Sequence, residues 1–197
     1  MSVQDPTRYT GADGDCPARV VVVGLGNVLT GDDAVGPTVV RVLDAEYEMP
    51  HQVELVDAGT PGMDLASLLA DVDAAIVVDS VMGDDPPGTV KLYDRESLVS
   101  RPLQPRTNPH APGLPETLLS LELLDLGPAR VLLVGVIPQQ VEVGVGLSPA
   151  LSAAVPALVA AVTAELEGMG LAPRRREDPG PADLWWMRSP ALAGTVT

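Results

Sequence analysis

The chain has 197 residues, which suits one domain with short tails and a single substantial core. Hydrophobic residues make up 46% and charged residues 20%, a composition typical of globular rather than disordered chains. The formal net charge of −15 argues against nucleic acid or an anionic membrane as partner, because both require a basic surface.

The single cysteine, Cys16, excludes an internal disulfide framework and a thiolate cluster for zinc. It lies in a polar stretch, residues 1–18, which shows no signal-peptide pattern, and no apolar run suggests a membrane span. We therefore expect a cytoplasmic protein, monomeric by default for its size, with a flexible amino-terminal tail.

Strand and helix patterns alternate along the chain. This alternation predicts an α/β fold, a three-layer α/β/α sandwich around a mostly parallel sheet of about five strands. The domain is expected to span residues 19–170, followed by a loosely ordered extension over residues 171–197. The predicted strands cover residues 20–25, 53–56, 75–78, 89–93 (an edge strand) and 131–136, and the predicted helices begin at residue 34 and cover 63–70, 116–124 and 149–167.

Acidic residues follow two of the buried-looking strands. Asp32 and Asp33 come soon after the first strand, and Asp79 ends the apolar run 74–78. Carboxyl ends of strands in α/β sheets face a crevice where ligands bind. A buried, unpaired carboxylate is costly, so Asp79 is expected to face that crevice or to have a partner.

With His110, one of the two histidines, Asp33 and Asp79 would supply two oxygen donors and one nitrogen donor, leaving open coordination positions. Such a set suits nickel, zinc or manganese. A simpler interpretation exists for each residue. One of the paired aspartates is expected to cap a helix, and we assign capping to Asp32 and outward projection to Asp33. Asp79 could be a structural hydrogen-bond acceptor, and a lone histidine in a proline-rich loop is often simply exposed.

Two further features favour structural interpretations. Gly24 and Gly26 form only a partial dinucleotide-binding pattern, because its third glycine position holds Leu29, so we interpret them as a tight turn with close backbone approach. Near the carboxyl end, the arginines at 174–176 are interpreted as a solvated charge run, and the tryptophans at 185–186 as docking on the protein's own surface.

The run from Gly24 to Gly36 resembles the first signature of the hydrogenase maturation proteases. The similarity continues, in the expected order, through residues 57–60, 78–80, 109–110, 133–138 and 146–149. The resemblance implies a phosphorylase/hydrolase-like α/β/α fold. It also implies an endopeptidase that removes the carboxyl-terminal extension from the large-subunit precursor of a nickel-iron hydrogenase.

By position, the resemblance implies that Asp33, Asp79 and His110 bind metal and that Asp33 and Asp79 act in catalysis. The metal would be nickel carried by the precursor, although zinc or cadmium could occupy the same site. It further implies that Asp57, Gly59 and Thr60 contact the substrate. Two alternatives stay open: a non-catalytic nickel-site chaperone or binding module, and a nucleotide-binding α/β enzyme.

Overall fold

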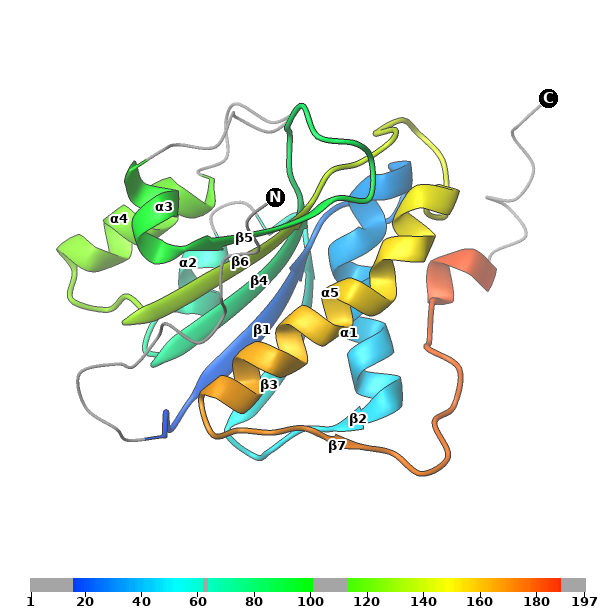
Figure 1. The fold of residues 1–197 in the computed structure, drawn as a ribbon. Coiled ribbons are helices and arrows are strands. Elements are labelled where there is room, and N and C mark those ends of the chain that lie inside the picture. The colour runs from blue at the N-terminus through cyan, green and yellow to red at the C-terminus, as the bar shows by residue number, and fades with distance from the viewer. Residues whose placement is uncertain (1–15, 62–63, 101–112, 189–197) are drawn as a thin grey trace.

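The computed structural model describes residues 16–61, 64–100 and 113–188, and its centre is a five-stranded sheet flanked by helices (Figure 1). The strand order is β3-β1-β4-β6-β5. Neighbouring strands are parallel except β5 and β6, which are antiparallel at one edge. The predicted sheet and its edge strand are confirmed. The strands are β1 (Val20–Leu25), β3 (Val53–Gly59), β4 (Ala74–Ser80), β5 (Val90–Asp94) and β6 (Arg130–Val136).

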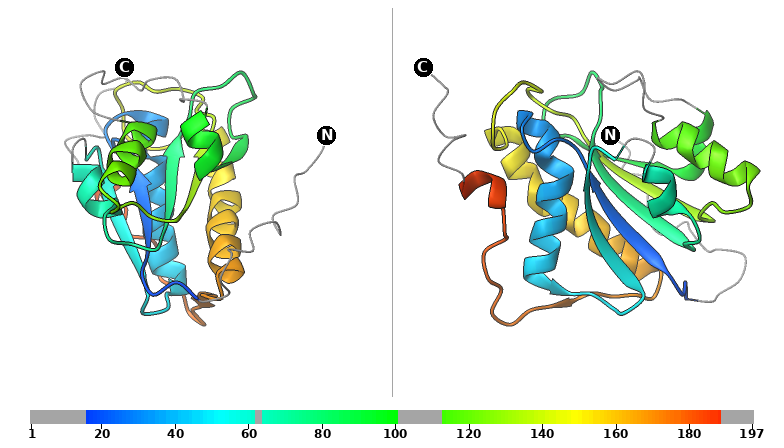
Figure 2. Two further views of the ribbon diagram at one scale, coloured as in Figure 1. Left: turned by 90° about the vertical axis from the view of Figure 1, so that its left-hand side faces the viewer. Right: turned by 180° about the vertical axis from the view of Figure 1, so that it is seen from behind.

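Helices cover both faces of the sheet, which confirms the three-layer prediction. Seen from behind, α2 lies in front of the strands and α5 lies behind them (Figure 2). Two separate hydrophobic clusters fill the spaces between the layers. The helices on one face are α1 (Val35–Glu46) and α5 (Pro149–Gly168), and those on the other are α2 (Leu65–Leu69), α3 (Arg95–Ser100) and α4 (Leu114–Leu123).

The first strand is apolar along its whole length because it is buried on both faces. Val20 and Val22 pack in the cluster under α1 and α5, whereas Val21 and Val23 pack in the cluster under α2 and α4. Successive side chains of a strand point to opposite faces, so a central strand needs apolar residues at every position. The run of four valines is the sequence consequence of that position.

Helix α5 begins at a proper cap, since the hydroxyl of Ser148 accepts a hydrogen bond from the backbone N–H of Leu151 at 3.3 Å. Contrary to the expectation from sequence, this helix is long and apolar enough to cross a membrane by length and composition. Its inner face packs into the core, and 39% of the apolar window is buried there. The buried residues are Leu151, Ala154, Leu158, Val159, Val162 and Leu166.

The order of the strands creates a crevice at the carboxyl end of β1. From β1 the chain passes through α1 to β3 on one side, and then through α2 to β4 on the other side of β1. Helices α1 and α2 cover opposite faces of the sheet, so the connections diverge at this point. In open α/β sheets such a divergence marks the ligand-binding edge.

At its amino end, the chain is held in place from Ala18 onward. The backbone N–H groups of Ala18 and Arg19 donate to the carboxylate of Asp73 at 2.8 and 2.9 Å. These bonds lie at the amino edge of the sheet, opposite the crevice. The predicted flexible tail, residues 1–18, falls mostly outside the described residues.

The described part of the predicted extension, residues 171–188, contains paired structure, and the rest of it lies outside the described residues. Its strand β7 (Arg174–Arg175) pairs antiparallel with β2 (Tyr47–Glu48), directly after α1. The arginines are therefore not a free charge run, because acidic residues at the end of α1 are close enough to pair with them. The ion pairs join Arg174 to Glu48, Arg175 to Glu46 and Arg176 to Glu48.

Helix α1 lies unusually close to β1 because glycines face each other at their contact. A Cβ atom built on Gly36 would lie 2.2 Å from the carbonyl oxygen of Leu25 and 2.5 Å from that of Val78. A Cβ on Gly24 would lie 2.4 Å from the carbonyl oxygen of Gly36. Backbone atoms cannot move aside as a flexible side chain can, so both positions require glycine.

We predict that Gly36→Ala lowers the free energy of unfolding by about 3 kcal/mol, because the added methyl forces α1 away from two strands. Urea denaturation would measure the change. Gly168→Ala is the matched control, since no atom lies within 4 Å of a Cβ built there. Equal stability of the two variants would contradict the close-packing argument.

Candidate functional site

The side chain of Asp33 connects the loop after β1 with the end of β4. Asp33 lies in the short 3-10 helix η1 (Gly31–Ala34), where it is half-buried. Its Oδ2 accepts a hydrogen bond from the backbone N–H of Asn27 at 2.7 Å, and its Oδ1 accepts one from the hydroxyl of Ser80 at 2.9 Å. These contacts hold the carboxylate at the carboxyl edge of the sheet.

Asp79 directly precedes Ser80 at the carboxyl end of strand β4 and is only 6% exposed. Its register partner on β6 is Gly135, which has no side chain to compete for the space. The hydrogen bond from Ser80 places the Asp33 carboxylate at the strand end that carries Asp79, and the joint role of the two acids stays a prediction. Ser80, which donates to Asp33, was not predicted as a site residue.

His110 lies outside the described residues, so its position relative to the two carboxylates stays a prediction. Among residues 16–61, 64–100 and 113–188, no group of three or more metal-binding side chains comes together. A complete metal site would need a donor from outside these ranges, and His110 is the candidate that the sequence supplies.

Asp32 has a different role from the capping role predicted for it. The residue is fully buried, and its carboxylate accepts three backbone N–H groups from the segment between β6 and α5. Oδ2 accepts from Gln139 and Gln140 at 2.8 and 3.0 Å, and Oδ1 accepts from Ser148 at 2.6 Å. The capping assignment was wrong because these partners are more than a hundred residues away in the sequence.

The same segment also pairs with the backbone just before Asp32. The N–H of Gly31 donates to the carbonyl of Gly144, and the N–H of Gly144 donates to the carbonyl of Leu29, at 3.0 and 2.9 Å. Loops that follow β1 and β6 are thus joined into one unit. Asp33, the next residue along, is positioned by that unit.

Gly26, in the loop after β1, is hydrogen-bonded to Gly59, the last residue of β3. The N–H of Gly26 donates to the carbonyl of Gly59 at 2.8 Å, and both residues have positive φ angles, +135° and +55°. A Cβ on Gly26 would lie 1.7 Å from the carbonyl oxygen of Asp33. The close-approach interpretation of Gly24 and Gly26 is confirmed.

A pocket of about 380 Å³ opens beside Gly26 and Gly59. The predicted substrate-binding residues Asp57, Gly59 and Thr60 all line it. Asp57 is not a free carboxylate, because its Oδ2 accepts hydrogen bonds from Nε and Nη2 of Arg41 at 3.3 and 3.0 Å. The full lining is Gly26, Asn27, Val28, Arg41, Asp57, Ala58, Gly59, Thr60 and Trp185.

Two pocket residues could not have been identified from local sequence. Arg41 is on the outer part of α1, and its partner Asp57 is 16 residues further on, at the end of β3. Trp185 comes from the carboxyl-terminal segment, which returns to the pocket from the far end of the domain. No spacing rule relates either residue to the signature motifs.

We predict that Asp32→Asn lowers the free energy of unfolding by about 3 kcal/mol, because the amide has one acceptor oxygen where three N–H groups need partners. Urea denaturation would measure this, with the exposed Glu54→Gln as control for loss of a carboxylate. Equal midpoints for the two variants would mean that Asp32 does not hold the loop.

Comparisons with known proteins identify the family of this chain. The family model described as hydrogenase maturation protease matches residues 37–165. The hydrogenase 2 maturation protease of Escherichia coli K12 is 34% identical over 160 residues, covering 81% of this chain and 97% of that protein. The hydrogenase expression/formation protein HupD of Rhodobacter capsulatus is 30% identical, covering 79% of this chain and 74% of that one.

A solved structure extends the likeness to three dimensions. The hydrogenase maturating endopeptidase HybD from Escherichia coli superposes with a TM-score of 0.75 at 34% identity, covering 81% of this chain and 99% of that chain. The family-model match, residues 37–165, includes most of α1 and all of β3, β4 and β6, and β4 carries Asp79. On these grounds, the chain belongs to the hydrogenase maturation protease family and is a peptidase.

Proposed function

We propose that this peptidase hydrolyses one peptide bond in the large-subunit precursor of a nickel-iron hydrogenase and releases its carboxyl-terminal extension. Family membership supports the reaction class. The observation that supports the site is the hydrogen bond from Ser80 to Asp33, because it brings that carboxylate to the strand end where Asp79 lies. The large-subunit precursor is also the proposed protein partner.

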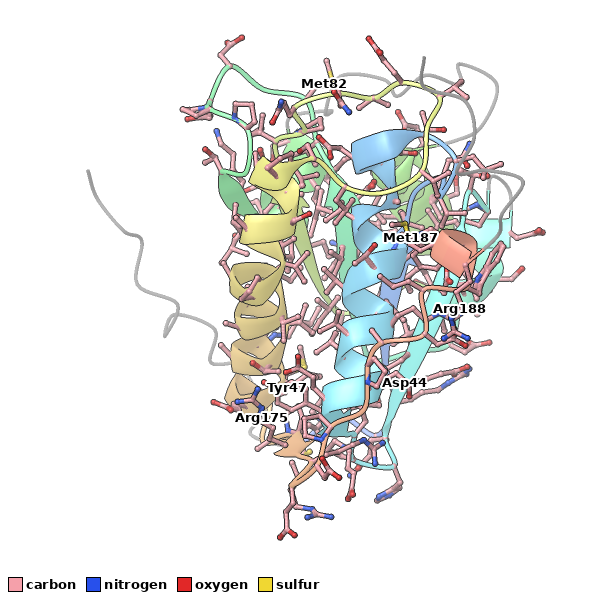
Figure 3. The ribbon with its side chains drawn as sticks, turned by 90° about the vertical axis from the view of Figure 1, so that its right-hand side faces the viewer. Asp44, Tyr47, Met82, Arg175, Met187 and Arg188 are labelled. Atoms are coloured by element: carbon pink, nitrogen blue, oxygen red, sulfur yellow. The ribbon has the colours of Figure 1, made fainter. Side chains whose placement is uncertain are left out.

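The surface around the two carboxylates suits a protein substrate. Loops at the carboxyl ends of β1, β4 and β6 expose apolar side chains to solvent: Leu29, Met82 and Val143 are 44%, 69% and 96% exposed. Large exposed apolar side chains gathered near one site are typical of surfaces that bind another protein. Met82 stands at this edge in Figure 3.

Nickel enters this proposal as part of the substrate. Asp33 accepts hydrogen bonds from Asn27 through Oδ2 and from Ser80 through Oδ1, which fix the orientation of its carboxylate, and carboxylate oxygens are common ligands of divalent cations. Together with Asp79 and His110, Asp33 would hold the precursor's nickel, and zinc or cadmium could bind the same donors. Only a precursor that has received its metal would then dock with the scissile bond in place.

Two routes can activate the attacking water in this arrangement. In one, Asp33 or Asp79 removes its proton as a general base. In the other, the substrate's metal polarises the scissile carbonyl or the water. In either case one water is consumed, the C–N bond breaks, and the proton ends on the leaving amine. Both routes require the carboxylates to remain ionised, which a bound cation favours over the repulsion between two neighbouring acids.

The proposal places a monomeric enzyme in the cytoplasm. Its single cysteine, Cys16, is exposed and has no second cysteine in the chain with which to form an internal disulfide. That composition is common in reducing compartments.

We predict that Asp79→Asn abolishes cleavage while leaving the fold intact, because the amide can neither accept a proton nor balance a cation's charge. The measurement is the intact mass of the nickel-loaded precursor after incubation. Asp73→Asn, at the opposite end of the same strand, is the control and should cleave normally. Full activity of the Asp79 variant would exclude the proposed site.

We further predict that cleavage requires both the precursor's nickel and His110. Nickel-free precursor should keep its full mass with the wild-type enzyme, and His110→Ala should leave the loaded precursor uncut. A precursor that binds tightly to the wild-type protein but is never shortened would support the chaperone alternative. Efficient cleavage of nickel-free precursor would contradict recognition through the metal.

A further inference from the structure

We propose that the carboxyl-terminal segment, residues 171–188, is part of the substrate-binding site. In this proposal Trp185 contacts an apolar side chain of the precursor and thereby determines specificity. This inference rests on the proposed function. It adds a recognition element that lies outside the residues matched by the family model, which end at 165.

The segment is fixed along the outside of α1 and ends beside the crevice. It leaves the end of α5, pairs with β2 near the end of α1, and then runs back toward the start of that helix (Figure 1). Figure 3 shows this path, with Arg175 beside Tyr47 at one end and Met187 and Arg188 toward the other. The segment therefore reaches the edge that carries the candidate site.

Trp185 is held at the pocket by its neighbour. Trp186 is 1% exposed and is among the largest fully buried side chains, whereas Trp185 is 54% exposed. The two rings meet edge to face, with centroids 5.7 Å apart and planes at 87°. The buried ring thus anchors the short 3-10 helix η3 (Trp185–Arg188), and the other ring stays available for contact.

A second contact fixes η3 against a loop of the site. Gly146 precedes α5, and a Cβ built on it would lie 3.3 Å from Cε of Met187. Met187 therefore packs over Gly146. This glycine lies between Gln140 and Ser148, whose backbone N–H groups donate to the carboxylate of Asp32. The position of Trp185 is consequently coupled to the loops that position Asp33.

The pocket favours an uncharged side chain. Its charged lining residues, Arg41 and Asp57, are paired with each other at 3.0 Å, so their charges compensate. The surface that remains for recognition is the indole of Trp185, the apolar side chains of Val28 and Ala58, the uncharged polar side chains of Asn27 and Thr60, and backbone. An aliphatic or aromatic side chain gains contact area on the indole without displacing the ion pair.

The pocket is next to the proposed reacting groups. Asn27 lines the pocket, and its N–H is the group that donates to Asp33 at 2.7 Å. A peptide bound across the proposed reacting carboxylates would pass this loop. The pocket can therefore receive a side chain close to the cleavage point.

The test compares steady-state cleavage of the nickel-loaded precursor by wild-type enzyme, Trp185→Ala and Trp185→Phe. We expect Trp185→Ala to raise KM about tenfold with little change in kcat, because the contact stabilises bound substrate and transition state alike. Trp185→Phe should largely restore KM. Leu123→Ala, which removes an 87% exposed apolar side chain from α4, is the control and should behave as wild type.

A double-mutant cycle identifies the partner side chain. Each apolar residue within about four positions of the cleaved bond of the precursor is replaced by alanine in turn. One replacement should raise KM for the wild-type enzyme and have little effect on Trp185→Ala, because the contact is already lost there. Additive effects at every position would overturn the proposed contact.

The outcomes separate this inference from the proposed function. If the wild-type enzyme does not shorten the precursor, the proposed function fails, and the dissociation constants of the same variants still report on the pocket. Unchanged KM and dissociation constant in Trp185→Ala would overturn the inference while leaving the protease intact. A lower KM in that variant would also overturn it, since Trp185 would then obstruct the pocket.

Discussion

The buried carboxylate of Asp32 is the interaction on which the candidate site depends. A charged group without solvent is tolerated only when hydrogen bonds replace its water, and here three backbone N–H groups do so. Those donors lie in the connection between β6 and α5, and one of them, Ser148, also caps α5. The carboxylate thus ties the start of one helix to the loop that precedes another.

The adjacent residues Asp32 and Asp33 lie in different environments. Asp32 points into the protein and is fully used by its backbone partners, whereas Asp33 is half-buried and meets Ser80 at the sheet edge. The structural acid thus directly precedes the acid that we propose for the reaction, and the hydrogen bonds of both fix the same short loop.

The carboxyl-terminal segment shows how unequal contacts combine to fix a surface element. Its arginine–glutamate pairs are largely exposed, and exposed pairs contribute only about 0–1 kcal/mol each. The strand pairing and the ion pairs therefore set the direction of the segment more than its stability. Burial of Trp186 is the stronger contact, because losing a buried aromatic ring costs about 3–5 kcal/mol. The exposed Trp185 then depends on its neighbour for a fixed position.

The sequence by itself determined the layers, the sheet and the acids at its edge. Apolar β-branched runs and amphipathic stretches are local patterns, so β1, β4 and the start of α5 at Ser148 could be located within a few residues. The motif around Gly24 and Gly26 also indicated close backbone contact. These features depend on neighbours in the chain, and their physical cause is visible in a short window.

Only the tertiary structure decided which partner each polar group has. Asp32 binds N–H groups 107 to 116 residues away, Arg41 compensates Asp57 across two elements, and Arg174 meets Glu48 at a separation of 126. No local pattern encodes such pairings, because they arise when distant segments meet at one edge of the sheet. For the same reason the sequence indicated no partner for the arginine run and no particular docking place for the tryptophans, whereas folding pairs the arginines with Glu46 and Glu48 and places Trp185 at the pocket.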